Sequence, residues 1–272
     1  MALATIAGVE LHYRDAGVEG RPAMLLIHGY TGNARNWALQ IKPLIEAGWH
    51  CLSADSPGHG LSSAPTDLAA YEFGNVADLF HQLAVALDFG PVVICGHSMG
   101  GAIAEEYAVR FPADVRALVL VDSAGGASGP ERAEMGDDIE ALRAAHAVGG
   151  MGAVYDRLLS IGARLPQPTL SLAQAQLLRD EFAKTSWVGY EYAGLALRTR
   201  RETLTRLADW HKPTLIIHGE NESVGLKKVA ADLASAITNA ESVVIPRAGH
   251  NPQLDNPEEF NKVLLNFLAR LG

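Results

Sequence analysis

The fold is decided by the stretch Val92-Val93-Ile94-Cys95-Gly96-His97-Ser98-Met99-Gly100-Gly101. Its first four residues are apolar, and the segment 102–110 that follows ends just before Pro112. This pattern predicts a strand, a sharp turn at Ser98 and then a helix. Glycines two residues either side of the serine remove the Cβ atoms that would clash in such a turn, and a strained serine backbone pushes its hydroxyl into the open. The stretch is not a phosphate-binding loop, because it lacks the Gly-Lys-Ser/Thr ending.

Short, mostly apolar runs recur along the chain on both sides of that stretch. They cover residues 24–27, 51–54, 92–95, 118–121, 215–217 and 243–245. Runs that are apolar at consecutive positions suit strands covered on both faces, which is typical of a mostly parallel sheet. Helical spacing of apolar residues appears between them, at 76–87 before Gly90 and again at 260–271. Alternating strands and helices predict an α/β fold with right-handed crossovers.

Two segments depart from this rhythm. Val9, Leu11 and Tyr13 alternate with polar residues and predict an antiparallel edge strand. Residues from about 123 to about 210 have a helical composition without a convincing strand, and they begin with a glycine-rich exit at 124–130. A segment this long between two sheet strands is more consistent with a small helical cap than with a loop.

Composition excludes several classes of protein. The chain has 272 residues, of which 48% are hydrophobic, so it can bury a large core and is not intrinsically disordered. Lys and Arg number 22 against 31 Asp and Glu, giving a net charge of −9 without a basic cluster, which argues against a nucleic-acid partner. Its two cysteines, Cys51 and Cys95, lie in apolar runs and are too few for a disulfide framework or a cysteine metal site.

The location of the protein is predicted from the same sequence. Residues 1–6 contain no basic segment followed by a long apolar stretch, and no uncharged apolar run approaches the about 18 residues of a membrane span. We therefore expect a soluble, cytoplasmic protein whose partner is a small-molecule substrate and not a membrane.

A serine hydroxyl becomes a useful nucleophile when a base removes its proton. His250 follows the run 243–245 and precedes the last helix, so it lies at the carboxyl edge of the sheet, where the turn at Ser98 also opens. The imidazole in turn needs a carboxylate to hold its tautomer. Glu222, in the acidic loop after the run 215–217, is the first choice, with Asp122 and Glu220 as alternatives. The order Ser98, Glu222, His250 is the one expected for an elbow-type hydrolase.

The negative oxygen of a tetrahedral intermediate needs hydrogen-bond donors aimed at it. His28-Gly29-Tyr30-Thr31 follows the run 24–27 and reaches the same edge of the sheet. We therefore expect the backbone N–H groups of Tyr30 and Met99 to form the oxyanion hole.

These motifs together resemble those of the α/β-hydrolase superfamily, in its cap-bearing branch of serine esterases, enol-lactone hydrolases, meta-cleavage hydrolases and haloperoxidase-like enzymes. The resemblance runs from Val9 to Phe260 and rests on four blocks in the family's order, which are His28-Gly29, Asp55-Ser56-Pro57-Gly58-His59-Gly60, residues 96–101 and Gly249-His250. It implies an eight-stranded, mostly parallel sheet with helices on both faces, formed by residues 1–122 and 211–272, and a helical cap at 123–210 after the sixth strand. The block around Asp55 and His59 is implied to be structural. Glu222 stands where the family usually has Asp.

The resemblance and the triad predict a serine hydrolase that cleaves a small or medium carboxylic ester, thioester or lactone through an acyl-enzyme, without metal or organic cofactor. Trp187, Tyr190 and Tyr192 of the cap are candidates for the substrate pocket, although aromatic residues at such spacing equally suit packing between cap helices. Two alternatives stay open. One is a C–C bond hydrolase of the meta-cleavage type using the same three residues, and the other is a ligand-binding protein of this fold with little turnover.

Overall fold

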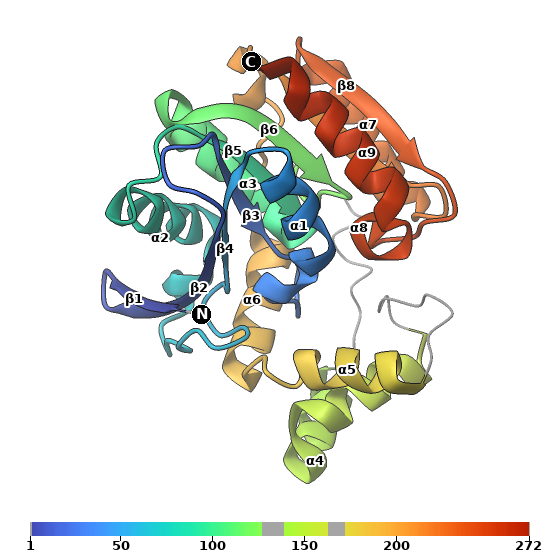
Figure 1. Ribbon diagram of the computed structural model, residues 1–272. Coiled ribbons are helices and arrows are strands. Elements are labelled where there is room, and N and C mark those ends of the chain that lie inside the picture. The colour runs from blue at the N-terminus through green and yellow to red at the C-terminus, as the bar shows by residue number, and fades with distance from the viewer. Residues whose placement is uncertain (1, 127–138, 163–171, 272) are drawn as a thin grey trace.

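The computed structural model describes residues 2–126, 139–162 and 172–271. At its centre lies an eight-stranded sheet in the order β1-β2-β4-β3-β5-β6-β7-β8 (Figure 1). All six apolar runs lie in strands, and the six strands β3 to β8 run parallel to one another, as the sequence predicts. The strands are β1 (Ala2–Ile6), β2 (Val9–Ala16), β3 (Ala23–Ile27), β4 (His50–Ala54), β5 (Val92–His97), β6 (Val115–Val121), β7 (Thr214–Gly219) and β8 (Ala240–Ile245).

The prediction for the N-terminal edge is wrong in one respect. The alternating segment forms β2, which pairs antiparallel with both β1 and β4, so it is the second strand and β1 is the edge. The sequence signal for β1 is weak because only Ile6 of its five residues is buried. The turn between the two strands is also unusual, since Ala7 and Gly8 both have positive φ, and Ala7 is not a residue that marks such turns.

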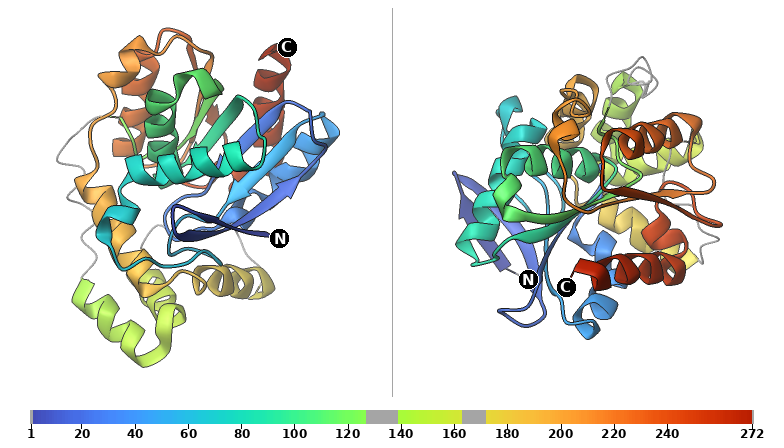
Figure 2. Two further views of the ribbon diagram at one scale, coloured as in Figure 1. Left: turned by 90° about the vertical axis from the view of Figure 1, so that its left-hand side faces the viewer. Right: turned by 90° about the horizontal axis from the view of Figure 1, so that it is seen from above.

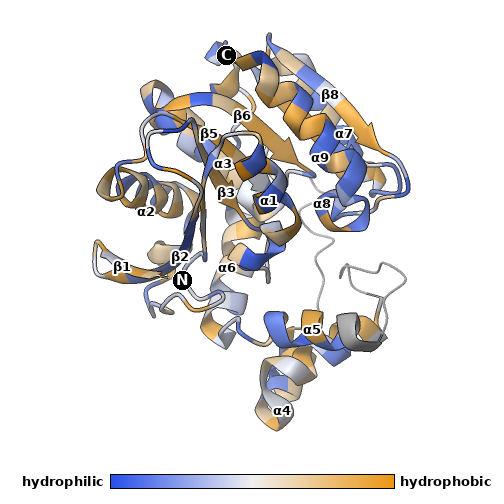
Figure 3. Cartoon of the chain, in the orientation of Figure 1, coloured by the Kyte–Doolittle hydropathy of each residue, from blue (hydrophilic) through white to orange (hydrophobic). Residues whose placement is uncertain are grey.

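Helices cover both faces of the sheet, so successive residues of a central strand enter different cores. Leu25 and Ile27 of β3 pack with α2 (Phe73–Ala86), α3 (Met99–Arg110) and α7 (Val224–Ala236). Met24 and Leu26 pack on the opposite face with α1 (Ala38–Glu46) and α9 (Pro257–Leu268), beside the short α8 (Pro252–Asp255). Figure 2 shows these two helical layers from two further directions. In Figure 3, β6 is hydrophobic along much of its length whereas α9 alternates, as expected for a buried strand and a surface helix.

Between β6 and β7 the described residues form three α-helices, which confirms the helical segment after the sixth strand. They are α4 (Ile139–Ser160), α5 (Leu172–Phe182) and α6 (Trp187–Thr199), and α4 is broken at Gly149 and Gly150. They share a core of their own that includes Leu142, Val154 and Tyr190. In Figures 1 and 2, α4 and α5 form a lobe away from the sheet, with α6 between them and the sheet. The division at 123 and 210 into two domains stays a prediction, and residues 127–130 of the expected exit lie outside the described residues.

Short 3-10 helices complete the connections. They are η1 (Ala34–Trp37), η2 (Leu68–Tyr71), η3 (Pro112–Asp114), η5 (Arg206–Asp209) and η6 (Ala269–Leu271). Cys51 and Cys95 are free and buried, and burial raises the pKa of the Cys51 thiol to about 12, as fits a structural thiol. Among the described helices, none combines the length and apolar character that crossing a bilayer requires.

Candidate active site

Ser98 sits in the strained turn that the motif predicts. It lies between β5 and α3 with φ 52° and ψ −114°, in a region that residues with a Cβ rarely adopt. The flanking glycines are required by space. A Cβ at Gly96 would lie 2.0 Å from the carbonyl oxygen of Gly100, and a Cβ at Gly100 would lie 2.4 Å from that of Ile27. The backbone therefore packs so closely on both sides of Ser98 that neither glycine can carry a side chain.

The structure brings Ser98, His250 and Glu222 into one hydrogen-bonded chain. Ser98 Oγ lies 3.0 Å from His250 Nε2, and His250 Nδ1 is hydrogen-bonded to Glu222 Oε2. Glu222 Oε1 accepts from the N–H of Ser223, so donors engage both oxygens of this carboxylate. Ser98 is 8% exposed and Glu222 is 6% exposed, and these interactions are therefore shielded from water. In this arrangement the hydroxyl donates to Nε2 and the imidazole donates from Nδ1.

Glu222, and neither of the two alternative acids, is hydrogen-bonded to His250 Nδ1. Glu220 turns outward, where its carboxylate accepts from the N–H of Arg247. Asp122, at the end of β6, accepts from the N–H of Gly219 at 3.3 Å. One oxygen of Asp122, one oxygen of Glu222 and one ring nitrogen of His250 lie within 4.8 Å of one another. Burial, followed by the charge of Glu222, raises the pKa of Asp122 to about 9. Although these residue types can bind metals, both ring nitrogens of His250 are already engaged by Ser98 and Glu222.

His97 is a part of the site that the sequence reasoning missed. Its Nε2–H donates to the backbone carbonyl of His250 at 2.6 Å, and the two rings lie 5.0 Å apart. Burial lowers the pKa of His97 to about 3, so the ring is neutral and adds no charge beside His250. The available signal was a histidine at the end of an otherwise apolar buried strand, directly before the serine. On the other side of the loop, Asp255 accepts from the N–H of Gly249 at 2.9 Å and holds the residue that precedes His250.

The expected oxyanion loop packs directly against the elbow. Gly29 lies so close that a Cβ there would be 3.3 Å from Ser98 Cβ and 2.6 Å from His97 Nδ1. His28 Nδ1–H donates to the carbonyl of Gly29 at 2.7 Å and fixes the turn from inside. Tyr30 follows Gly29 and Met99 follows Ser98, so the backbone groups expected to act as donors belong to the two segments in contact.

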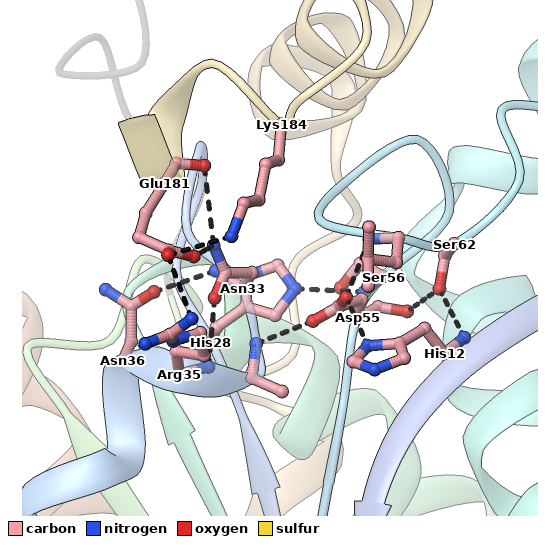
Figure 4. Close-up of polar contacts among 12 residues, drawn as sticks. His12, His28, Asn33, Arg35, Asn36, Asp55, Ser56, Ser62, Glu181 and Lys184 are labelled. Atoms are coloured by element: carbon pink, nitrogen blue, oxygen red, sulfur yellow. Dashed lines mark hydrogen bonds and ion pairs between the residues drawn. The ribbon is translucent and has the colours of Figure 1, made fainter. Parts of the chain in front are cut away.

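The block around Asp55 lies beside this loop and is hydrogen-bonded to it (Figure 4). Asp55 is buried and accepts three hydrogen bonds, from the N–H of Ala34 at 2.7 Å, from the N–H of Leu61 at 2.8 Å and from Nδ1–H of His12 at 2.7 Å. The N–H of Ser56 donates to His28 Nε2 at 2.9 Å. These contacts are structural in kind, as the resemblance implies.

The inserted helices are tied to the same loop. The carboxylate of Glu181, near the end of α5, accepts from Asn33 Nδ2 at 3.1 Å and pairs with Arg35 at 3.3 Å and with Lys184 at 2.8 Å (Figure 4). The hydroxyl of Tyr30 donates to the backbone carbonyl of Tyr190 in α6 at 2.6 Å. The cap therefore rests on the loop that would stabilise the oxyanion.

The three aromatic candidates for the substrate pocket have different surroundings. Tyr190 is buried, and its ring lies 5.2 Å from that of Tyr30. Trp187 stacks on Tyr190 at 5.7 Å, one step further into the cap. Tyr192 points the other way and meets Tyr71 edge-on at 5.5 Å. Tyr190 is thus the one whose ring touches a residue of the expected oxyanion loop.

Comparison with known proteins agrees with this fold. Residues 22–257 match the family described as the alpha/beta hydrolase fold. The AB hydrolase superfamily protein YisY of Bacillus subtilis is 27% identical over 95% of both chains. The 2-hydroxy-6-oxononadienedioate/2-hydroxy-6-oxononatrienedioate hydrolase of Paraburkholderia xenovorans is 28% identical over 96% of this chain and 91% of its own. A carboxylesterase structure from Nitrososphaera gargenis superposes with a TM-score of 0.85 at 23% identity, covering 99% of this chain and 98% of its own. The chain belongs to the alpha/beta hydrolase fold family.

Proposed function

We propose that the protein is a serine hydrolase that cleaves a small or medium carboxylic ester, thioester or lactone through a triad of Ser98, His250 and Glu222. The observation that carries this proposal is the unbroken chain of hydrogen bonds from the Ser98 hydroxyl through His250 to Glu222, at a turn whose backbone is strained at Ser98. A buried carboxylate behind the imidazole stabilises the positive charge that forms when the ring takes a proton.

The reaction would proceed in two halves. Ser98 Oγ attacks the acyl carbon while its proton moves to His250 Nε2, and the N–H groups of Tyr30 and Met99 hold the resulting oxyanion. His250 then gives that proton to the leaving oxygen or sulfur, which leaves an acyl-enzyme. Water next attacks the acyl carbon as His250 takes its proton, and the returning proton restores the Ser98 hydroxyl as the acid departs. Each proton moves through the same ring nitrogen.

The cap is proposed to shape the substrate pocket. Tyr190 reaches the oxyanion loop through Tyr30, and it is the strongest candidate for a wall beside the acyl group. Trp187 and Tyr192 would act further from Ser98, on the leaving group or through the packing of α6.

A second candidate function uses the same triad. The relative named as a 2-hydroxy-6-oxononadienedioate hydrolase favours cleavage of a C–C bond in a vinylogous diketone. Such a reaction needs the same nucleophile and base and differs in the bond that the substrate offers.

A substrate panel separates the two candidates. Short p-nitrophenyl esters, lactones and vinylogous diketones are assayed with the wild type and with Ser98→Ala, and both proteins are treated with a fluorophosphonate that labels activated serines. We expect ester or lactone turnover and labelling in the wild type, and neither in Ser98→Ala. Turnover confined to the diketones would establish the second candidate, and equal turnover by Ser98→Ala would refute the triad.

A further inference from the structure

A second carboxyl group lies behind the Glu222 carboxylate, and the proposed mechanism gives it no task. Asp122 ends β6 in the left-handed region, with φ 41°, and its N–H donates to the carbonyl of Ile217 at 2.8 Å. Its Oδ2 accepts from the N–H of Gly219. Its Oδ1 is buried and receives no hydrogen bond from a donor in the described part of the chain. Asp122 is 1% exposed, so water does not compensate that oxygen from the surface.

The described residues around Asp122 bring negative charge to it and no fixed cation. Glu222 and Asp255 both act on it as neighbouring acids. His250 uses Nδ1 for Glu222, and the buried ring of His97 is neutral and faces the backbone of His250. Two ionised carboxylates packed together in a dry interior repel one another and lose their hydration, and the usual resolution is that they share one proton.

The hydrogen bonds decide which acid holds this proton. Both oxygens of Glu222 face donors, namely Nδ1–H of His250 and the N–H of Ser223, so this group is stabilised as a carboxylate. One carboxyl oxygen of Asp122 lies within 4.8 Å of an oxygen of Glu222. Asp122 faces one donor, at Oδ2, and its Oδ1 has no donor among the described residues. A protonated carboxyl group can turn that oxygen into a donor.

We propose that Asp122 is a positioning residue that carries a proton on Oδ1 and donates it as a hydrogen bond to the Glu222 carboxylate. The inference rests on the proposed triad, because its consequence is for the acid that orients His250. The bond would aim Glu222 at Nδ1 and keep the charge behind the imidazole at one unit instead of two. The raised pKa of Asp122, about 9, agrees with a neutral carboxyl group at neutral pH.

The direct test is infrared spectroscopy, because a neutral carboxyl group has a C=O stretch separate from the bands of carboxylates. The spectrum of the wild type minus that of Asp122→Asn should show this band at neutral pH. The band should disappear as the pH rises into the alkaline range. Glu105→Gln is the matched control, because Glu105 is another buried acid whose pKa is raised by burial but which bonds to Ser123, Gly126 and Thr203. The Asp122 band should persist in that variant. A difference spectrum without the band would overturn the proposal.

Kinetics give the second readout. Asp122→Leu removes the donor and should lower kcat by about 10–100-fold with KM little changed, as expected for a lost hydrogen bond to a charged group. Asp122→Asn presents an N–H to Glu222 and should recover most of that loss. Ionisation of Asp122 should make the wild-type kcat fall at alkaline pH, and this fall should be absent from Asp122→Asn. An Asn variant as impaired as the Leu variant would contradict the proposal.

Two outcomes separate this inference from the triad itself. If fluorophosphonate labels Ser98 but the infrared band is absent, the shared proton is refuted and the serine hydrolase stands. If the band is present but Ser98 is neither labelled nor needed for turnover, the carboxyl pair exists and the proposed function fails. Should Asp122→Leu not fold, the spectrum and pH profile of Asp122→Asn still decide.

Discussion

Replacing Asp122 with asparagine should remove a pH dependence from the stability of the fold. The pKa of Asp122 is raised from its ordinary 3.8 to about 9, chiefly by burial. Between these two values the folded carboxyl pair keeps a proton that the unfolded chain has released. The folded state binds more protons, so the free energy of unfolding is highest at low pH and declines as the pH rises toward the folded value.

The size of this effect follows from the linkage relation. One extra bound proton gives a slope of about 1.4 kcal/mol per pH unit, so the pair lowers the wild-type free energy of unfolding by about 4 kcal/mol from about pH 5 to about pH 8. Asparagine has nearly the same shape as aspartate and does not titrate. In Asp122→Asn this pH-dependent contribution of the pair to the free energy of unfolding is therefore absent. All other groups, including Glu105, are common to both proteins and cancel in the difference.

Urea unfolding followed by tryptophan fluorescence at several pH values measures both free energies. The free energy of unfolding of Asp122→Asn minus that of the wild type should increase steadily with pH across this range. A constant difference at all pH values would show that Asp122 is already ionised in the folded protein, and the reasoning about the shared proton would then fail.

Three further substitutions test the site. Glu222→Gln should lower kcat about 10³–10⁴-fold without unfolding the protein, because an amide favours the wrong tautomer of the base; near-normal ester turnover would show that another acid does this work. His97→Leu should lower kcat about tenfold through loss of its hydrogen bond to the His250 carbonyl, and His97→Gln, which keeps an N–H there, should restore it; equal rates in both variants would contradict a positioning role. Gly100→Ala should destabilise the protein by about 3 kcal/mol, since its Cβ would meet the carbonyl end of β3 at 2.4 Å, whereas Gly90→Ala, with open space at its Cβ, should be nearly neutral by thermal unfolding.

The parallel part of the sheet could be predicted because burial on both faces leaves a strong local signal. Strands such as β3, with all five residues buried, need continuous apolar runs, and these are visible without knowing what the strand pairs with. The edge strand β1 has no such continuous apolar run. Its side chains alternate between solvent and a shallow contact, and it is stabilised by pairing with β2. Its strand conformation therefore depends on pairing with β2, which the sequence of residues 2–6 alone does not indicate.

The candidate site was predictable to a similar extent and for a similar reason. Ser98 is set by glycines within two residues of it, and His250 and Glu222 by following strands that end at one edge of the sheet. Sequence alone could not choose between Asp122 and Glu222, since both follow neighbouring strands of that edge. The choice depends on side-chain reach. Glu222 makes the hydrogen bond to Nδ1 of the imidazole, while the carboxyl group of Asp122 lies within 4.8 Å of the ring and accepts from the N–H of Gly219.

The proposed substrate pocket and the reacting groups are held in place by different kinds of contact. The geometry at Ser98 depends on backbone contacts that any side chain larger than hydrogen would break, as at Gly96 and Gly100. The contacts that fix the cap join residues about 150 positions apart, such as Tyr30 to Tyr190 and Asn33 to Glu181, and they use ordinary hydrogen bonds and rings. Such contacts can be exchanged without disturbing the elbow. The proposed substrate pocket can therefore be altered by substitutions in the cap while the backbone contacts at Ser98 are kept.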